Sequence, residues 1–240
     1  MLPKAILFDL DDTIISFDGA ADTAWEIICN SFVMEMKTSF DEKTLLESVN
    51  NVRTWYWGDP DRHRVGRLNM IQARRDIVKM ALENLGYTEV ENGRRMADNY
   101  SKLQDELICM FPDSQVTLEK LKHLGVRMAL ITNGTSEKQR SKIDRFCLSG
   151  FFEFCLIEGE VGFGKPDVRV FEIALKKLGL SANEVWMVGD NLTWDIEAPQ
   201  KLGIFSIWND FEKKGLPAES TVRPDKIINS ISELIGEDVL

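Results

Sequence analysis

The chain has 240 residues, of which 44% are hydrophobic and 28% charged; this composition is typical of a soluble globular protein and excludes a disordered chain. Its 39 acidic and 29 basic residues give a formal net charge of −10, which argues against a nucleic-acid polymer or an anionic membrane as partner, and no apolar run is long enough to cross a bilayer. The 4 cysteines form no CxxC pair and only 2 histidines accompany them, so we expect no zinc site and a reduced, cytoplasmic location.

The first predicted element is a strand over residues 4–10, a short apolar run rich in Ile, Leu and Phe. The run is too short for the apolar region of a signal peptide, and acidic residues follow it at once. Because one strand cannot form a sheet alone, we expect it to pair with strands from later in the chain.

A helical block follows, from residue 18 to about residue 110. In this stretch apolar residues recur at helical spacing, and no convincing buried strand interrupts them. The spacing is clearest at Trp25, Ile28, Phe32 and Met36, at Leu68, Ile71, Arg75, Val78, Leu82 and Leu85, and at Ala97, Tyr100, Leu103 and Leu107. Gly86 is a stop signal for the second of these helices.

The second half of the chain alternates between helices and strands. Helices are predicted over residues 116–124, 138–146 and 168–178 and before Gly203, and strands over 126–132, 154–157, 185–188 and 204–208. This order predicts a parallel sheet covered by helices on both faces. We therefore expect an α/β domain of residues 1–16 and 111–240 with a helical domain, residues 17–110, inserted into it, and a surface loop over 213–223.

Polar side chains gather where the predicted strands end, which is where ligands bind to open α/β sheets. The four strand ends carry Asp9, Asp11, Asp12 and Thr13, then Thr132, Asn133 and Gly134, then Lys165, and finally Asp190 and Asp195. Adjacent carboxylates repel, and a hard divalent cation such as Mg²⁺ relieves that repulsion. A carboxylate can also attack phosphorus, while a second acid transfers protons and a hydroxyl, backbone N–H groups and a lysine hold the phosphoryl oxygens.

The order of these residues resembles the haloacid dehalogenase superfamily over nearly the whole chain. The DxDxT motif of that family appears as residues 9–13, its strand-end Ser or Thr as Thr132, its lysine as Lys165, and its GDxxxxD motif as residues 189–195. The helical insertion directly after the first motif resembles the helical cap of the C1 class. The resemblance implies a Rossmann-like parallel sheet core with an inserted helical cap domain, in the phosphatase branch of the family.

The resemblance also implies a role for each motif residue. Asp9 is the nucleophile and Asp11 the general acid and base. Asp195 supports the metal site or positions Lys165. Mg²⁺ is bound by Asp9, by Asp190 and by the backbone carbonyl of Asp11. Phosphate is bound by Thr132, by Lys165 and by the backbone N–H groups of Asn133 and Gly134.

The implied activity is that of a Mg²⁺-dependent phosphomonoester hydrolase, acting on a small phosphorylated metabolite through an aspartyl-phosphate intermediate. Dehalogenating members lack an acid at the position of Asp11, because a halide leaves without a proton, so Asp11 favours phosphoryl transfer over haloacid cleavage. Phosphomutases carry both acids and stay an alternative, and the first motif is similar to the nucleotidase and sugar-phosphate phosphatase branches. A non-catalytic binding protein is the least favoured reading. We expect a monomer or homodimer.

Residues 53–75 carry a net positive charge although the whole chain is negative, because their 6 arginines and 2 acids give 6 − 2 = +4. Such a segment suits a loop that recognises the substrate, with aromatic rings for a sugar or base and arginine for a carboxylate or second phosphate. The candidate specificity residues are Arg53, Trp55, Tyr56, Trp57 and Arg62. The alternative is that the tryptophans belong to the core of the helical block and the arginines to a solvated helix face.

Lys165 also belongs to a second sequence motif. Residues 159–165 match the GxxxxGK pattern of a nucleotide-binding P-loop, between a predicted strand and a predicted helix. The next residue is Pro166, where a P-loop needs Ser or Thr to hold Mg²⁺, and proline has no N–H for phosphate. The motif therefore does not favour a nucleotide triphosphate site.

Overall fold

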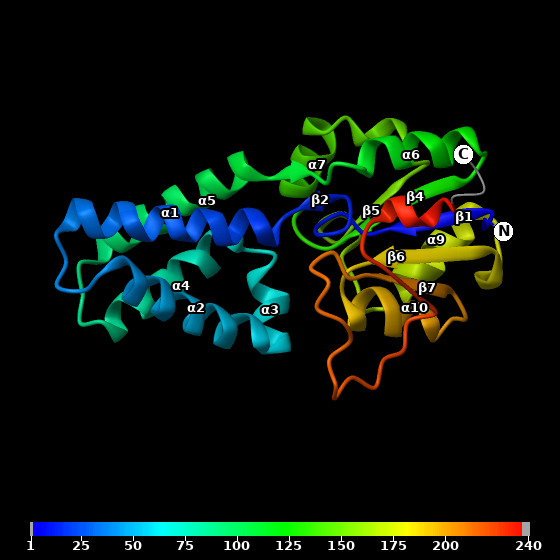
Figure 1. Ribbon diagram of the computed structural model, residues 1–240. Coiled ribbons are helices and arrows are strands. Elements are labelled where there is room, and N and C mark those ends of the chain that lie inside the picture. The colour runs from blue at the N-terminus through cyan, green and yellow to red at the C-terminus, as the bar shows by residue number, and fades with distance from the viewer. Residues whose placement is uncertain (1, 237–240) are drawn as a thin grey trace. The chain divides into compact units, whose positions relative to one another are not determined.

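Six strands form one parallel sheet in the computed structural model, which describes residues 2–236. The strand order is β5-β4-β1-β6-β7-β8. The bounds are β1 (Ala5–Phe8), β4 (Arg127–Thr132), β5 (Cys155–Ile157), β6 (Val185–Gly189), β7 (Phe205–Asn209) and β8 (Lys226–Ile228) (Figure 1). The expected α/β fold with a parallel sheet is confirmed, and β8 is a strand that the sequence pattern did not predict.

Strand β1 lies in the middle of this sheet, between β4 and β6. Phe8 is in register with Leu130 on one side and with Val188 on the other. All four residues of β1 are buried, as a strand covered on both faces requires. The expectation that the first strand joins later strands is therefore confirmed, and the first motif begins at the centre of the sheet edge.

Helices connect these strands and cover the sheet. They are α6 (Ser114–His123), α7 (Ser136–Arg145), α8 (Glu158–Val161), α9 (Arg169–Leu178) and α10 (Ala198–Gln200), with short 3-10 turns η1 (Leu148–Gly150), η2 (Ala182–Glu184) and η4 (Ile231–Leu234). Helix α9 packs Val170 and Phe171 into a core shared with Ala5 and Leu7 of β1. It ends at Gly179, whose φ of 65° is the left-handed conformation that glycine adopts readily.

The helix expected before Gly203 has a different form. Residues Leu192–Glu197 form a π-helical turn, η3, and only Ala198–Gln200 continue as α-helix. Pro199 lies in that last turn and has no N–H to donate to an earlier carbonyl. A π turn of this kind is common at functional sites.

The described residues form two compact units, residues 2–16 with 110–236, and Phe17–Cys109. The second unit contains α1 (Asp18–Met36), α2 (Glu42–Gly58), α3 (Pro60–Gly66), α4 (Met70–Asn84) and α5 (Val90–Leu107) (Figure 1). Its core includes Trp25, Phe32, Leu45, Ile77 and Tyr100. We call Phe17–Cys109 the helical unit and the remainder the α/β unit.

A second, two-stranded sheet pairs β2 (Ile15–Ser16) with β3 (Cys109–Met110), and the sequence pattern did not predict either strand. The segment 213–223, expected to be a loop, contains neither helix nor strand. Among residues 2–236, none of the helices is both long enough and apolar enough to cross a membrane.

Candidate active site

The carboxylate of Asp9 lies directly after β1, at the end of the central strand. Its backbone N–H donates to the carbonyl oxygen of Val188 at 2.9 Å, so the sheet still holds the residue in place. The residue is only 6% exposed. Its Oδ1 accepts a hydrogen bond from Lys165 Nζ at 2.6 Å, and its Oδ2 accepts one from Thr13 Oγ1 at 3.4 Å. The predicted nucleophile is therefore held at the end of the central strand of the sheet.

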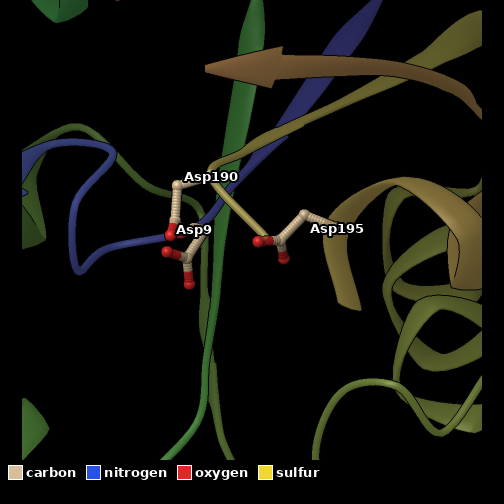
Figure 2. Close-up of side chains that lie close together, drawn as sticks. All are labelled: Asp9, Asp190 and Asp195. Atoms are coloured by element: carbon tan, nitrogen blue, oxygen red, sulfur yellow. The ribbon is translucent and has the colours of Figure 1, made fainter. Parts of the chain in front are cut away.

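Two further carboxylates come from the end of β6 and the turn after it. Asp190 follows Gly189, and the side-chain oxygen of Asn191 accepts from two backbone N–H groups of the turn that returns Asp195 to the strand end. A Cβ on Gly189 would collide with the Asp195 carboxylate, so this approach requires glycine. Oxygen atoms of Asp9, Asp190 and Asp195 all lie within 4.8 Å of one another (Figure 2).

Lys165 joins two of these acids. Its Nζ donates to Oδ1 of Asp9 and to Oδ1 of Asp195, both at 2.6 Å. The second oxygen of Asp195 accepts from the backbone N–H of Asn191 at 3.1 Å. Both oxygens of Asp195 therefore accept hydrogen bonds, as both oxygens of Asp9 do, and the role of Asp195 in positioning Lys165 stays a prediction. These contacts also account for Lys165 without a P-loop.

The electrostatics of the cluster follow from burial and crowding. Burial raises the pKa of Asp9 to about 7, with Lys165 opposing and Asp195 and Asp11 reinforcing the increase. Burial, followed by the charges of Asp9 and Asp195, raises the pKa of Asp190 well above its usual range. Burial alone would lower the pKa of Lys165, but the Asp195 and Asp9 carboxylates more than offset it and the pKa is raised. One lysine thus leaves part of the negative charge unbalanced.

This donor set fits a hard divalent cation. Asp9 and Asp190 provide carboxylate oxygens, the ligands that Mg²⁺ prefers in proteins. A cation beside them would favour the ionised form of both acids and oppose the burial and the repulsion that raise their pKa values. The third predicted ligand, the backbone carbonyl of Asp11, stays a prediction.

The predicted phosphate-binding residues lie on the neighbouring strand end. Thr132 is the last residue of β4, and its Oγ1 accepts from Gln139 Nε2 at 2.5 Å. The side-chain amide of Asn133 forms two hydrogen bonds to the backbone of Lys165. Its Nδ2 donates to the Lys165 carbonyl oxygen at 2.7 Å, and its Oδ1 accepts from the Lys165 N–H at 2.8 Å. Asn133 therefore links this strand end to the lysine loop.

The backbone N–H of Gly134 already has an acceptor. It donates to Oε2 of Glu158 at 3.0 Å, and Glu158 is buried. Binding of phosphate by this N–H stays a prediction, and it requires the contact with Glu158 to be exchanged for one with phosphate. Glu158 is a contact of this loop that the sequence pattern did not predict.

Asp11 contacts a different set of groups. Lys142 Nζ donates to its Oδ1 at 2.7 Å and to its Oδ2 at 2.9 Å, and Gln139 Nε2 donates to Oδ2 at 3.1 Å. Sequence reasoning missed both partners. The signal available was their spacing, since residues three apart share a face of the helix that follows Thr132.

Strand β7 supplies two further contacts that the sequence did not reveal. Trp208 Nε1 donates to the backbone oxygen of Asp190 at 2.6 Å. Asn209 Nδ2 donates to the backbone oxygen of Asp12 at 3.2 Å, and Asp12 has a φ of 58°, the left-handed region. Two adjacent residues of one strand thus hold the loops that follow β1 and β6.

In the helical unit, Trp55 and Arg62 form an exposed pair. Trp55 is 50% exposed, and the Arg62 guanidinium lies 3.8 Å from the centre of its ring. Arg62 also donates from Nη2 to the Trp55 carbonyl oxygen at 2.7 Å and from Nε to the Tyr56 carbonyl oxygen at 3.3 Å. This surface aromatic ring stacked with a cation is distinct from a core tryptophan.

The other three candidate specificity residues have structural partners. Tyr56 and Trp57 pack against the core of the helical unit, with ring centres 4.9 Å apart. Arg53 donates to Oδ1 of Asp22 at 3.0 Å and to Oδ1 of Asn50 at 2.9 Å. Trp55 is the exposed ring among the aromatic candidates, and a role of any of the five in substrate recognition stays a prediction.

Comparisons with known proteins match most of the chain. A model of haloacid dehalogenase-like hydrolases matches residues 3–203. The phosphoserine phosphatase of Thermus thermophilus is 31% identical over 77% of this chain and 68% of its own length. The glyceraldehyde 3-phosphate phosphatase of Methanocaldococcus jannaschii is 27% identical over 97% of this chain and 95% of its own. The magnesium-bound hydrolase YfnB of Bacillus subtilis matches in fold, with a TM-score of 0.72, 20% identity, and coverage of 98% of this chain and 97% of its own.

Proposed function

The chain belongs to the haloacid dehalogenase-like hydrolases, and from this we propose that it is a Mg²⁺-dependent phosphomonoesterase that acts on a small phosphorylated metabolite. The observation that carries the proposal is the arrangement of Lys165 between Asp9 and Asp195, beside Asp190. This arrangement combines a positioned carboxylate, Asp9, with a buried cation, Lys165, that can attract a phosphate. The two phosphatase relatives support the choice of substrate class.

In the proposed reaction, Asp9 attacks the phosphorus atom and forms an aspartyl-phosphate. Asp11 gives a proton to the leaving oxygen and later takes one from the attacking water. Asp9, Asp190 and the backbone carbonyl of Asp11 would hold Mg²⁺, which when bound neutralises charge on the phosphoryl group. Asp195 orients the ammonium group of Lys165 toward Asp9.

Four groups would bind the phosphoryl oxygens in this account. Lys165 supplies a positive charge, Thr132 a hydroxyl, and Asn133 and Gly134 backbone N–H groups. Lys165 and Thr132 are buried, so their interactions with a bound anion would be only weakly screened by water.

Asp11 is the residue that separates this activity from dehalogenation. A halide leaves without a proton, whereas an alkoxide leaving group needs one. Asp11 is present and lies among hydrogen-bond donors at the strand end. A haloacid dehalogenase activity is therefore not favoured for this chain.

The helical unit would act as the cap. Residues 17–110 form the proposed cap domain, and residues 1–16 and 111–240 the proposed catalytic domain. Trp55 and Arg62 offer an exposed ring and a cation for the part of the substrate beyond the phosphate. We propose a cytoplasmic location, which the free cysteines favour, and no nucleic-acid or membrane partner, which the net charge of −10 favours. A monomer or homodimer is the proposed oligomeric state.

A phosphate-release screen tests the proposed function. The purified protein is assayed with Mg²⁺ against p-nitrophenyl phosphate, sugar phosphates, nucleoside monophosphates and small acid phosphates. We expect hydrolysis of the aryl phosphate and of at least one metabolite class, lost on chelation of Mg²⁺. If no phosphomonoester is hydrolysed by folded protein, the proposed function is wrong.

A further inference from the structure

The carboxylate of Asp11 is held by two side chains of one helix. Lys142 Nζ contacts both carboxylate oxygens, at 2.7 and 2.9 Å, and Gln139 Nε2 contacts Oδ2 at 3.1 Å. The side chain of Lys142 is only 12% exposed and that of Asp11 is 26% exposed, so this ion pair is partly shielded from solvent. Such a contact is stronger and better defined than an ion pair on an open surface.

Gln139 extends the contact to the phosphate-binding strand end. Its Nε2 also donates to Thr132 Oγ1 at 2.5 Å, and Gln139 is 2% exposed. One amide group thus joins the proposed acid and base to a proposed phosphate ligand. Because Gln139 and Lys142 lie three residues apart on α7, one helix face sets the position of both.

All of these contacts to Asp11 come from hydrogen-bond donors. Three donor contacts to its two oxygens restrict the orientation of the Asp11 carboxylate, which a group that takes a proton from water requires. We propose that Lys142 and Gln139 are positioning residues that hold the Asp11 carboxylate for the activation of water in the second half of the reaction. This inference rests on the proposed function and names residues beyond the family motifs.

The step in question starts from the aspartyl-phosphate on Asp9. The Asp11 carboxylate takes one proton from water, and the resulting hydroxide oxygen forms a bond to phosphorus. The bond between phosphorus and Asp9 Oδ breaks, and its electron pair returns to the Asp9 carboxylate. The products are hydrogen phosphate, ionised Asp9 and protonated Asp11, which is ready to protonate the next leaving group.

A role in this second step has a kinetic signature. The ratio kcat/KM reports steps up to formation of the aspartyl-phosphate, whereas kcat also includes its hydrolysis. With p-nitrophenyl phosphate the leaving group needs little protonation, so the first step depends only weakly on Asp11. Loss of the Lys142 contact should therefore lower kcat far more than kcat/KM, and a burst of p-nitrophenol should precede the slow steady state.

The test compares Lys142→Met and Lys142→Arg in the full-length protein with Mg²⁺ and p-nitrophenyl phosphate. For Lys142→Met we expect kcat to fall by about 10-fold or more, with little change in kcat/KM, because positioned proton transfer contributes at least that much. Lys142→Arg keeps a cation at this position and should recover most of the loss. Gln139→Leu should show the same burst. Arg145→Met, which removes an exposed cation from the last turn of α7, should behave as the wild type.

The outcomes separate this inference from the proposed function. If kcat and kcat/KM of Lys142→Met fall by the same factor without a burst, or if neither changes, the inference is wrong while the phosphatase assignment stands. If the wild type itself hydrolyses no aryl phosphate, the proposed function fails first. Circular dichroism of each variant ensures that the rates are compared between folded proteins, and a burst can arise only from folded enzyme.

Discussion

The ammonium group of Lys165 lies 2.6 Å from Oδ1 of Asp9, and the side chain of Lys165 is only 1% exposed. Removing two charges from water costs free energy that their attraction regains only with good geometry and further hydrogen bonds. A buried ion pair of this kind is therefore weak evidence for a stabilising role. Its place at the end of the central strand is instead what a catalytic centre requires.

Replacement of Lys165 should harm both stability and activity. In Lys165→Met, Asp9 and Asp195 would stay buried without their cation, so we expect the free energy of unfolding to fall by about 3 kcal/mol. Hydrolysis of p-nitrophenyl phosphate should be lost as well. Urea denaturation at neutral pH measures the first effect. Lys176→Met, at an exposed position of α9, is the matched control and should change neither property. Unchanged stability in Lys165→Met would contradict the ion-pair account.

The acid cluster predicts that stabilisation by Mg²⁺ depends on pH. The pKa of Asp9 is raised by burial from 3.8 to about 7, so between these values the folded chain binds a proton that the unfolded chain has released. The stability of the metal-free protein should therefore fall as the pH rises through this window. Because Mg²⁺ needs ionised ligands, it competes with that proton. The Mg²⁺-induced increase in Tm should be small at about pH 5 and large at about pH 8.

Thermal unfolding with and without Mg²⁺ at both pH values checks this prediction. Asp190→Asn removes one proposed ligand and is expected to abolish most of the Mg²⁺ effect at the higher pH. Equal Tm increases at both pH values would mean that Mg²⁺ does not displace protons from this cluster.

The presence of Asp11 predicts the bond that is cleaved. Asp11→Asn should reduce hydrolysis of alkyl phosphates by roughly 100-fold or more, because general acid and base catalysis contributes 10²–10⁴-fold. The wild type should release no halide from 2-haloacids. Phosphate and halide release are measured on the same preparations. Halide release that survives in Asp11→Asn would instead assign the chain to the dehalogenases.

Two neighbouring tryptophans should behave differently on substitution. Trp57 packs against the core of the helical unit, so Trp57→Ala should lower the free energy of unfolding by about 2 kcal/mol. Trp55 is exposed, so Trp55→Ala should cost less than about 1 kcal/mol. If Trp55 contacts substrate, its replacement should raise KM for the best metabolite in the screen and leave KM for p-nitrophenyl phosphate unchanged. Equal effects on both substrates would remove Trp55 from the specificity residues.

The sequence predicts the sheet and the strand-end residues well because their signals are local. Buried strands such as β1 are short apolar runs, and Asp9 follows the run directly. The parallel topology then brings separate strand ends to one edge. Asp190 could be placed beside Asp9 on this reasoning, and their proximity agrees with it.

The contacts to the Asp11 carboxylate, and those from β7 to the loops that follow β1 and β6, could not be predicted in the same way. Lys142 lies 131 residues from Asp11, and a polar residue on an amphipathic helix looks like part of a solvated face. The donation from Asn209 to Asp12 spans 197 residues and depends on the register of β7. The exposure of Trp55 likewise depends on the packing of α2, which composition and spacing do not determine.

In the proposed mechanism, Asp9 carries the phosphoryl group during turnover. Acid quenching of the wild type during hydrolysis of p-nitrophenyl phosphate, followed by borohydride reduction and peptide mapping, locates an acyl phosphate, because reduction converts that aspartate to homoserine. We predict homoserine at position 9 alone, and neither label nor turnover in folded Asp9→Asn. Label at another residue, or an Asp9→Asn variant that keeps its rate, would contradict the account.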